Sequence, residues 1–186
     1  MENLEPTSEK QPTDKPNTIY GELKEIANGN RVDWNGFSER MQKLNMELPR
    51  HSEQAIDFND PEQSQVINLG FCEVPISELL ESKDIVELLA EMEGQGKEGK
   101  SSAERVEWVS QNRDMADKDD YVYLYRLRDT NGDFYWQLGG GRHRLAADII
   151  ANKPTIRANV KLTKGFFSGE LGQKELARLE SLKTQV

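Results

Sequence analysis

The chain has 186 residues, of which 31% are charged, and a mean hydropathy of −0.78, so we expect a soluble protein with one principal domain. Its single cysteine, Cys72, excludes an internal disulfide framework, and one cysteine with two histidines argues against a metal site of the cysteine–histidine type. No apolar run reaches the roughly 18 residues that span a bilayer. The N-terminal residues show no signal-peptide pattern, so we expect a cytoplasmic location and no membrane partner.

The net charge of −9 is unevenly distributed along the chain. Residues 1–120 carry 13 Lys and Arg against 27 Asp and Glu, whereas residues 121–165 carry 8 against 3. An acidic chain with one basic segment favours a localised anion site over a broad nucleic-acid surface. We therefore expect a nucleotide as partner, with DNA possible but less favoured.

The first third of the chain reads as accessory to the main domain. Residues 1–18 are polar and proline-bearing, which predicts a disordered tail. Residues 19–28 and 34–46 space their apolar residues like short amphipathic helices within an accessory helical segment. Trp34, Phe37 and Met41 lie at helical spacing. Such a stripe usually covers a core, but if it is exposed it favours a protein partner.

The main domain is predicted to begin with a strand and a helix. The segment "VINLGFCEVPISELL" gives an apolar strand, in which Cys72 is expected to be buried, followed by a proline-containing turn. The next pattern indicates a helix with Ser82 as N-cap and with Ile85, Leu88 and Leu89 on one face. An insertion over residues 95–119 then adds a glycine-rich loop and a further helix that contains Trp108.

The basic segment begins with a hairpin. Two aromatic, β-rich runs, "YVYLYRLR" and "DFYWQL", flank Asn131-Gly132, a strong hairpin signal. The second run leads through three glycines into a helix with Leu145, Ala146 and Ile149 as its buried stripe, and "KPTIRANVKL" forms a strand. The predicted class is α+β, a small mixed sheet with packed helices. The predicted divisions are a tail (1–18), a helical segment (19–65), the main domain (66–165) and a C-terminal helix (166–186).

The glycine turn is the strongest candidate for a binding site. Gly139, Gly140 and Gly141 stand between a strand and a helix, where backbone N–H groups can turn toward an anion. The helix start adds N–H donors and the positive end of its dipole. Arg142 and Arg144 could each chelate a phosphate, and His143 could donate a hydrogen bond or move a proton near neutral pH.

The same residues also have a purely structural interpretation. Glycines between a strand and a helix are often plain turn residues, and arginines at a helix start are often solvated. The turn is not a Walker A loop, because no G-K-[ST] follows, and it lacks the G-x-G-x-x-G fingerprint. From the residues alone, both an anion site and a plain structural turn stay open.

The segment "DTNGDFYWQLGGGRHRLAADIIANKPTIRANV" resembles the signature region of the ParB/sulfiredoxin superfamily. In that family a hairpin strand ends in a G-x-[RH]-[RH]-R-type box, and a helix and a short proline-led strand follow. Residues 141–144 match the box, and the resemblance covers about residues 67–163, apart from the insertion. It implies a ParB/sulfiredoxin-like fold with extra N-terminal helices.

The resemblance implies a nucleotide pocket. Family members hold the phosphates of ATP, ADP or CTP at the box, usually with Mg²⁺, so residues 139–144 would form the cofactor-binding cradle. Lys83, at the start of the first helix, would be a further phosphate ligand. Glu78 or Glu81 would serve as general base or hold the metal, and His143 would take part in proton transfer. "SELLESKD" is equally typical of ordinary capping and surface charge.

Departures from the family narrow the function. The box lacks the cysteine that sulfiredoxin uses, which argues against sulfinic-acid reduction, and the short segment after Lys164 argues against centromere binding. The leading hypothesis is a nucleotide-binding enzyme with Mg²⁺-dependent ATPase, kinase-like or, less favoured, DNase activity. The alternative is a regulatory protein-interaction module whose nucleotide pocket is vestigial. An acidic side chain within reach of the cradle would distinguish them, since catalysis needs a place for a base or Mg²⁺.

Overall fold

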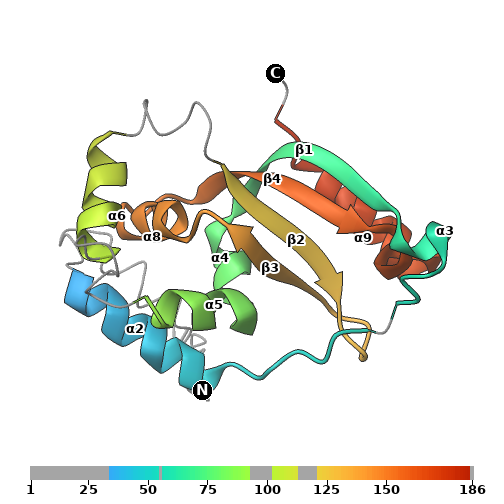
Figure 1. Ribbon diagram of the computed structural model, residues 1–186, viewed down its shortest axis with the longest axis horizontal. Coiled ribbons are helices and arrows are strands. Elements are labelled where there is room, and N and C mark those ends of the chain that lie inside the picture. Colours follow the sequence, from blue (N-terminus) through green and yellow to red (C-terminus); the bar gives the residue numbers. More distant parts are fainter. Residues whose placement is uncertain (1–33, 55, 93–101, 113–120, 185–186) are drawn as a thin grey trace, which may run out of the picture.

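The computed structural model describes residues 34–54, 56–92, 102–112 and 121–184 (Figure 1). In chain order its helices and strands are α2 (Trp34–Glu47), α3 (Pro61–Ser64), β1 (Val66–Pro75), α4 (Ile76–Leu80), α5 (Lys83–Ala90), α6 (Ser102–Gln111), β2 (Val122–Arg128), β3 (Phe134–Gly140), α8 (Arg142–Ile150), β4 (Thr155–Thr163), the 3₁₀ helix η1 (Lys164–Phe167) and α9 (Gly169–Ser181). The predicted tail, the predicted helix at 19–28 and much of the 95–119 insertion lie outside the described residues.

The four strands form one mixed sheet in the order β1-β4-β2-β3. Strand β4 is antiparallel to β1 and parallel to β2, and β2 and β3 form the antiparallel hairpin that the sequence predicted. The parallel neighbours β2 and β4 need a crossover connection, and the chain makes it through β3 and the helix α8. The chain is therefore an α+β protein with a small mixed sheet and packed helices.

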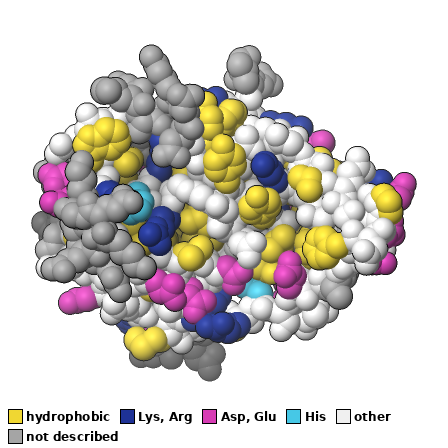
Figure 2. All heavy atoms as spheres, viewed as in Figure 1, with side chains coloured by type: hydrophobic (Ala, Val, Ile, Leu, Met, Phe, Trp, Pro, Cys, Tyr) yellow, Lys and Arg dark blue, Asp and Glu magenta, His cyan; other side chains and the backbone are white. Residues whose placement is uncertain are grey.

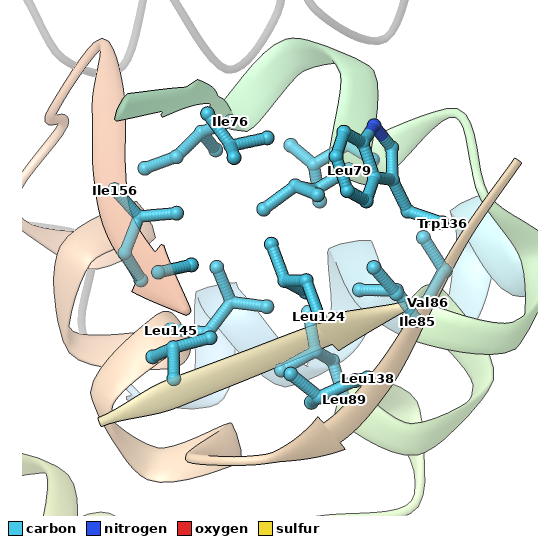
Figure 3. Packing of buried hydrophobic residues seen from close by; sticks show 14 of the residues in the cluster. Ile76, Leu79, Ile85, Val86, Leu89, Leu124, Trp136, Leu138, Leu145 and Ile156 are labelled. Carbon is cyan, nitrogen blue, oxygen red and sulfur yellow. The ribbon is translucent and has the colours of Figure 1, made fainter. Parts of the chain in front are cut away.

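One face of the sheet packs against helices to form the core. Leu124 and Trp136 of the sheet point toward Leu79 of α4, and Ile85 of α5 and Leu145 of α8 complete the packing (Figure 3). All five of these side chains are fully buried. The helix α2 then packs against α5 as an outer layer.

The expected faces of the helices are confirmed in part. Phe37 and Met41 of α2 are fully buried, so the aromatic stripe covers the core and is not an exposed partner surface. In α5 the buried residues include Ile85 and Leu89, as predicted, but Leu88 is only half-buried, and Val86 is buried instead. The helix α2 packs against α5, so more than one side of α5 is covered.

The C-terminal part follows the predicted order of helix, strand and helix. Leu145 and Ala146 of α8 are buried, while Ile149 is half-buried. Beyond α9 the chain returns to the edge of the sheet and covers part of β1. There the Glu73 N–H donates a hydrogen bond to the Leu182 carbonyl at 2.9 Å. Among the helices of the described ranges, none combines the length and apolar character needed to cross a bilayer.

Candidate functional site

The turn from β3 into α8 depends on Gly141 for backbone reasons. Gly141 has φ of 86°, in the left-handed region, and its carbonyl accepts the N–H groups of Arg144 and Leu145 at 3.0 Å. A Cβ at this position would stand 2.8 Å from the Cα of Val122. Both the dihedral angle and the close approach of β2 therefore require glycine here.

The other two glycines differ from each other. A Cβ on Gly139 would stand 2.4 Å from Cε2 of Tyr125, whose ring reaches across from β2. A Cβ on Gly140 would meet only the Tyr123 ring, at 3.6 Å, which is an ordinary contact. Packing thus accounts for Gly139 and Gly141 but not for Gly140, which leaves the backbone at Gly140 open to close approach from outside.

A cavity of about 710 Å³ opens at this turn. Its walls come from the end of β3, the first turn of α8, the inserted helix α6 and one residue of α5: Leu88, Arg105, Trp108, Val109, Leu138 and residues 139–144. Trp108, the aromatic residue of the insertion, is 48% exposed. The cavity therefore combines a glycine-lined backbone, cationic side chains and an apolar wall. Figure 2 shows Lys or Arg and His side chains together on the side of the molecule where α6 and α8 lie.

The three cationic residues of the turn have different exposures. Arg142 is exposed, His143 is half-buried, and Arg144 is only 7% exposed. Arg144 also lines a second cavity, of about 340 Å³, together with Asp148, Lys153 and Arg157. Arg142 is thus the accessible cation of these three residues and His143 a partly accessible imidazole, whereas Arg144 lies in the wall between α8 and the sheet.

The structure places the two predicted carboxylates elsewhere. Glu78 and Glu81 line a separate cavity of about 350 Å³, and none of the described residues around the glycine turn cavity is Asp or Glu. Both oxygens of Glu78 accept hydrogen bonds from Arg178, at 2.9 and 3.2 Å, and Oε2 also accepts from Nε1 of Trp136 at 3.2 Å. Glu78 therefore serves the packing of α4 against α9, and the predicted grouping of these glutamates with the turn is not observed.

Lys83 is also directed away from the turn. Its side chain is buried, and its ammonium donates a hydrogen bond to the carbonyl of Asn45 at the end of α2. Ser82 is the N-cap residue of α5, as predicted, but its hydroxyl donates to the Trp136 carbonyl and does not cap the helix. Within the described ranges, no group of three or more His, Cys, Asp and Glu side chains could hold a metal ion.

A buried ion-pair network forms the second polar centre, which the sequence did not predict. Arg126 of β2 donates to Glu175 of α9 at 2.8 Å, and Glu175 also accepts two hydrogen bonds from Arg178. Burial raises the pKa of the Glu175 carboxyl, but the two arginines outweigh burial and hold this pKa below its ordinary value. Burial lowers the pKa of Arg126, and Glu175 opposes that shift.

The sequence could have indicated that Arg126 is buried but not which residue pairs with it. Arg126 lies two residues after Leu124 in β2, and alternation places it on the core face, where a charge requires a partner. Its guanidinium lies 4.7 Å from the centroid of the Trp136 ring. Its acidic partner is 49 residues away in α9, and no local pattern links the two.

Comparison of the chain with models of known protein families, with curated proteins and with solved structures found no match.

Proposed function

We propose that this protein binds a nucleoside di- or triphosphate at the glycine turn, on a scaffold of the ParB/sulfiredoxin type. The observation that carries the proposal is the cavity in which Gly140, Arg142 and His143 line the same space. The order of elements, a hairpin, the box, a helix and a strand that returns to the sheet, supports the family resemblance.

The proposed pose follows from the chemistry of the walls. The turn leads into the first residue of α8, Arg142, at the positive end of the helix dipole, which favours a phosphate next to Gly140. Arg142 adds a guanidinium that can form paired hydrogen bonds to phosphate oxygens. On the other side, Leu88, Trp108 and Val109 offer an apolar wall that suits a nucleobase.

The geometry favours binding over catalysis. Phosphoryl transfer requires Mg²⁺ and usually a base, and carboxylates are their usual protein ligands. Glu78 and Glu81, the residues expected to supply them, line another cavity, and none of the described residues that line the cavity at the turn is Asp or Glu. We therefore propose that the nucleotide acts as a regulatory ligand. ATPase, kinase-like or DNase chemistry stays the second hypothesis.

Calorimetric titration with ATP, ADP and CTP, each with and without Mg²⁺, tests the proposal. We expect binding by the wild type, and a loss of about tenfold or more in Arg142→Gln, because one charge-assisted contact contributes roughly 1.5–3 kcal/mol. Lys174→Gln is the matched control, since Lys174 is an exposed cation of α9 paired with Glu170 and distant from the cavity walls. Folded wild type that binds none of the three nucleotides would overturn the proposal.

Release of inorganic phosphate from the bound nucleotide separates the two hypotheses. A regulatory ligand should remain intact over many times its residence time. Turnover that Arg142→Gln abolishes and Glu78→Gln leaves unchanged would show catalysis at the turn without that carboxylate. Turnover that depends on Glu78 would instead require α4 and the turn to come together in another conformation.

A further inference from the structure

The face of the sheet that points away from the core helices carries a row of aromatic side chains. Tyr123 and Tyr125 alternate with the buried Val122 and Leu124 in β2, and both tyrosines are half-buried. Tyr121 precedes them at the same spacing, next to the strand. Because Arg126, on the opposite face, contacts α9, the tyrosines face away from that helix.

Figure 1 shows β4 passing in front of α9, so Figure 2 looks onto the face that carries the tyrosines. Hydrophobic side chains, which include tyrosine, lie there beside Lys or Arg side chains in the middle of the view. We call the surface formed by the following residues the tyrosine face: Phe71, Tyr121, Tyr123, Tyr125, Arg157, Asn159 and Lys161. Strand pairing sets Tyr123 beside Asn159 and Tyr125 beside Lys161.

The glycines before α8 make room for this row. The Tyr125 ring occupies the space that a Cβ on Gly139 would need, and the Tyr123 ring lies next to Gly140. Successive residues of a strand rise about 3.3 Å, so the three tyrosines follow one another at about 6.6 Å. This is about twice the 3.4 Å rise per base of a duplex strand, so an unstacked single strand can place one base at each ring.

Cations stand directly beside the rings. The Arg157 guanidinium lies 4.7 Å from the centroid of Phe71, and the Lys161 ammonium lies 5.5 Å from the centroid of Tyr123. The carboxylate nearest to this row on β1 is that of Glu73, which pairs in register with Arg157 and accepts a hydrogen bond from Thr155 at 2.9 Å. Phosphates of a strand that stacks on the tyrosines would meet Lys161 and Arg157 along β4, with Glu73 beside Arg157.

We propose that the tyrosine face binds single-stranded nucleic acid, with bases stacked on the tyrosines and phosphates held by Arg157 and Lys161. Aromatic side chains interleaved with cations are the combination by which proteins hold single strands with little sequence preference. A duplex cannot use the rings, because its bases are already stacked and paired. Because two cations would hold the phosphates, the slope of log affinity against log salt should be roughly −1.4, at about −0.7 for each contact.

Fluorescence anisotropy of a labelled oligothymidylate of about 12 nucleotides tests this proposal at low and moderate salt, because single-strand sites of this kind span roughly 4–16 nucleotides. A duplex of equal length is the competitor, and oligouridylate reports whether RNA binds as well as DNA. We expect the single strand to bind and the duplex to compete poorly. No binding by folded wild type at low salt, or equal competition by the duplex, would overturn the proposal.

Variants identify the contacts. Loss of one stacking ring in Tyr123→Ala or Tyr125→Ala should weaken binding by about tenfold, and Tyr125→Phe should retain it, since stacking needs the ring and not the hydroxyl. Lys161→Gln should reduce the slope of log affinity against log salt by about 0.7, while the exposed cation control Lys174→Gln should not. If the alanine variants melt early, Tyr125→Phe and Lys161→Gln still decide the question.

The nucleotide site at the glycine turn and the single-strand site on the tyrosine face can be tested independently of each other. Arg142→Gln should weaken nucleotide binding by about tenfold or more and leave oligonucleotide binding unchanged, whereas Lys161→Gln should weaken oligonucleotide binding and leave nucleotide binding unchanged. If Arg142→Gln weakens the oligonucleotide as much as Lys161→Gln does, the strand binds at the glycine turn and the tyrosine face is not its site. If size-exclusion chromatography instead shows a dimer that Tyr125→Ala dissociates, the face is an interface between two copies and the proposal fails.

Discussion

Replacing Gly141 by alanine tests the structural account of the glycine turn. Alanine would have to adopt φ of 86°, and the left-handed conformation costs an L-residue roughly 1–2 kcal/mol. Its Cβ would also stand 2.8 Å from the Cα of Val122 and 2.9 Å from Cγ2 of the same residue. Backbone cannot swing aside as a side chain can, and overpacking of this kind costs about 1–3 kcal/mol.

We therefore expect Gly141→Ala to lower the free energy of unfolding by roughly 2–5 kcal/mol, the sum of those two costs. Gly140→Ala is the matched control, because its Cβ meets only ordinary contacts and its φ is not positive. Alanine at that position should change stability by less than about 1 kcal/mol, since it mainly restricts the unfolded chain. Urea unfolding of the three proteins, followed by far-ultraviolet circular dichroism, measures both differences.

A third variant separates the two causes of instability. Asparagine tolerates the left-handed region better than alanine does, but it carries the same Cβ. Gly141→Asn should thus recover part of the unfolding free energy that Gly141→Ala loses to the strained dihedral angle. It should recover none of the free energy lost to the overlap of the Cβ with Val122. If Gly141→Ala is as stable as Gly140→Ala within about 0.5 kcal/mol, the close approach of β2 to the turn is wrong. Full stability of Gly141→Asn alone would show that only the dihedral angle matters.

Three further predictions concern buried titratable groups. Because the folded pKa of Glu175 is depressed, this residue stabilises the fold above its unfolded pKa, and the stabilisation is lost as the pH falls through the folded value. Glu175→Gln should therefore flatten the acid limb of a plot of unfolding free energy against pH. Glu180→Gln, at an exposed position, should leave that limb unchanged. Burial, with nearby carboxylates, raises the pKa of Tyr135 to about 12, so ultraviolet titration of the wild type against Tyr135→Phe should show a phenolate that forms only near that pH; ionisation near 10 would contradict its burial. Burial raises the pKa of the Cys72 thiol, and this side chain is 1% exposed, so a thiol reagent should react with it at the rate of unfolding and not at that of an accessible cysteine.

The local order of elements followed from the sequence. Alternating apolar and aromatic residues in "YVYLYRLR" predicted β2, Asn131-Gly132 predicted the hairpin, and the helical spacing of Phe37 and Met41 predicted a helix that covers the core. These features depend on neighbours within a few residues, where the periods of strands and helices are legible. For the same reason the glycine turn could be recognised as the point where β3 ends and α8 begins.

Only the tertiary structure decided which of these residues meet. Glu78, Glu81 and Lys83 precede or begin α5, and only the family resemblance led us to expect them close in space to the glycine turn. Packing turns Glu78 toward Arg178 and Lys83 toward the carbonyl of Asn45. Their partners are 100 and 38 residues away, and pairing over such distances depends on how α9 and α2 dock on the sheet.

The two faces of β2 show the same division between sequence and tertiary structure. Alternation alone places Tyr123 and Tyr125 on one side and Leu124 and Arg126 on the other. Which side becomes the core depends on where the helices pack, and that arrangement buries Arg126 with Glu175 and leaves the tyrosines facing outward. The sequence thus determined the alternation, because that is a property of the strand itself, while long-range packing determined which face remained available for a ligand.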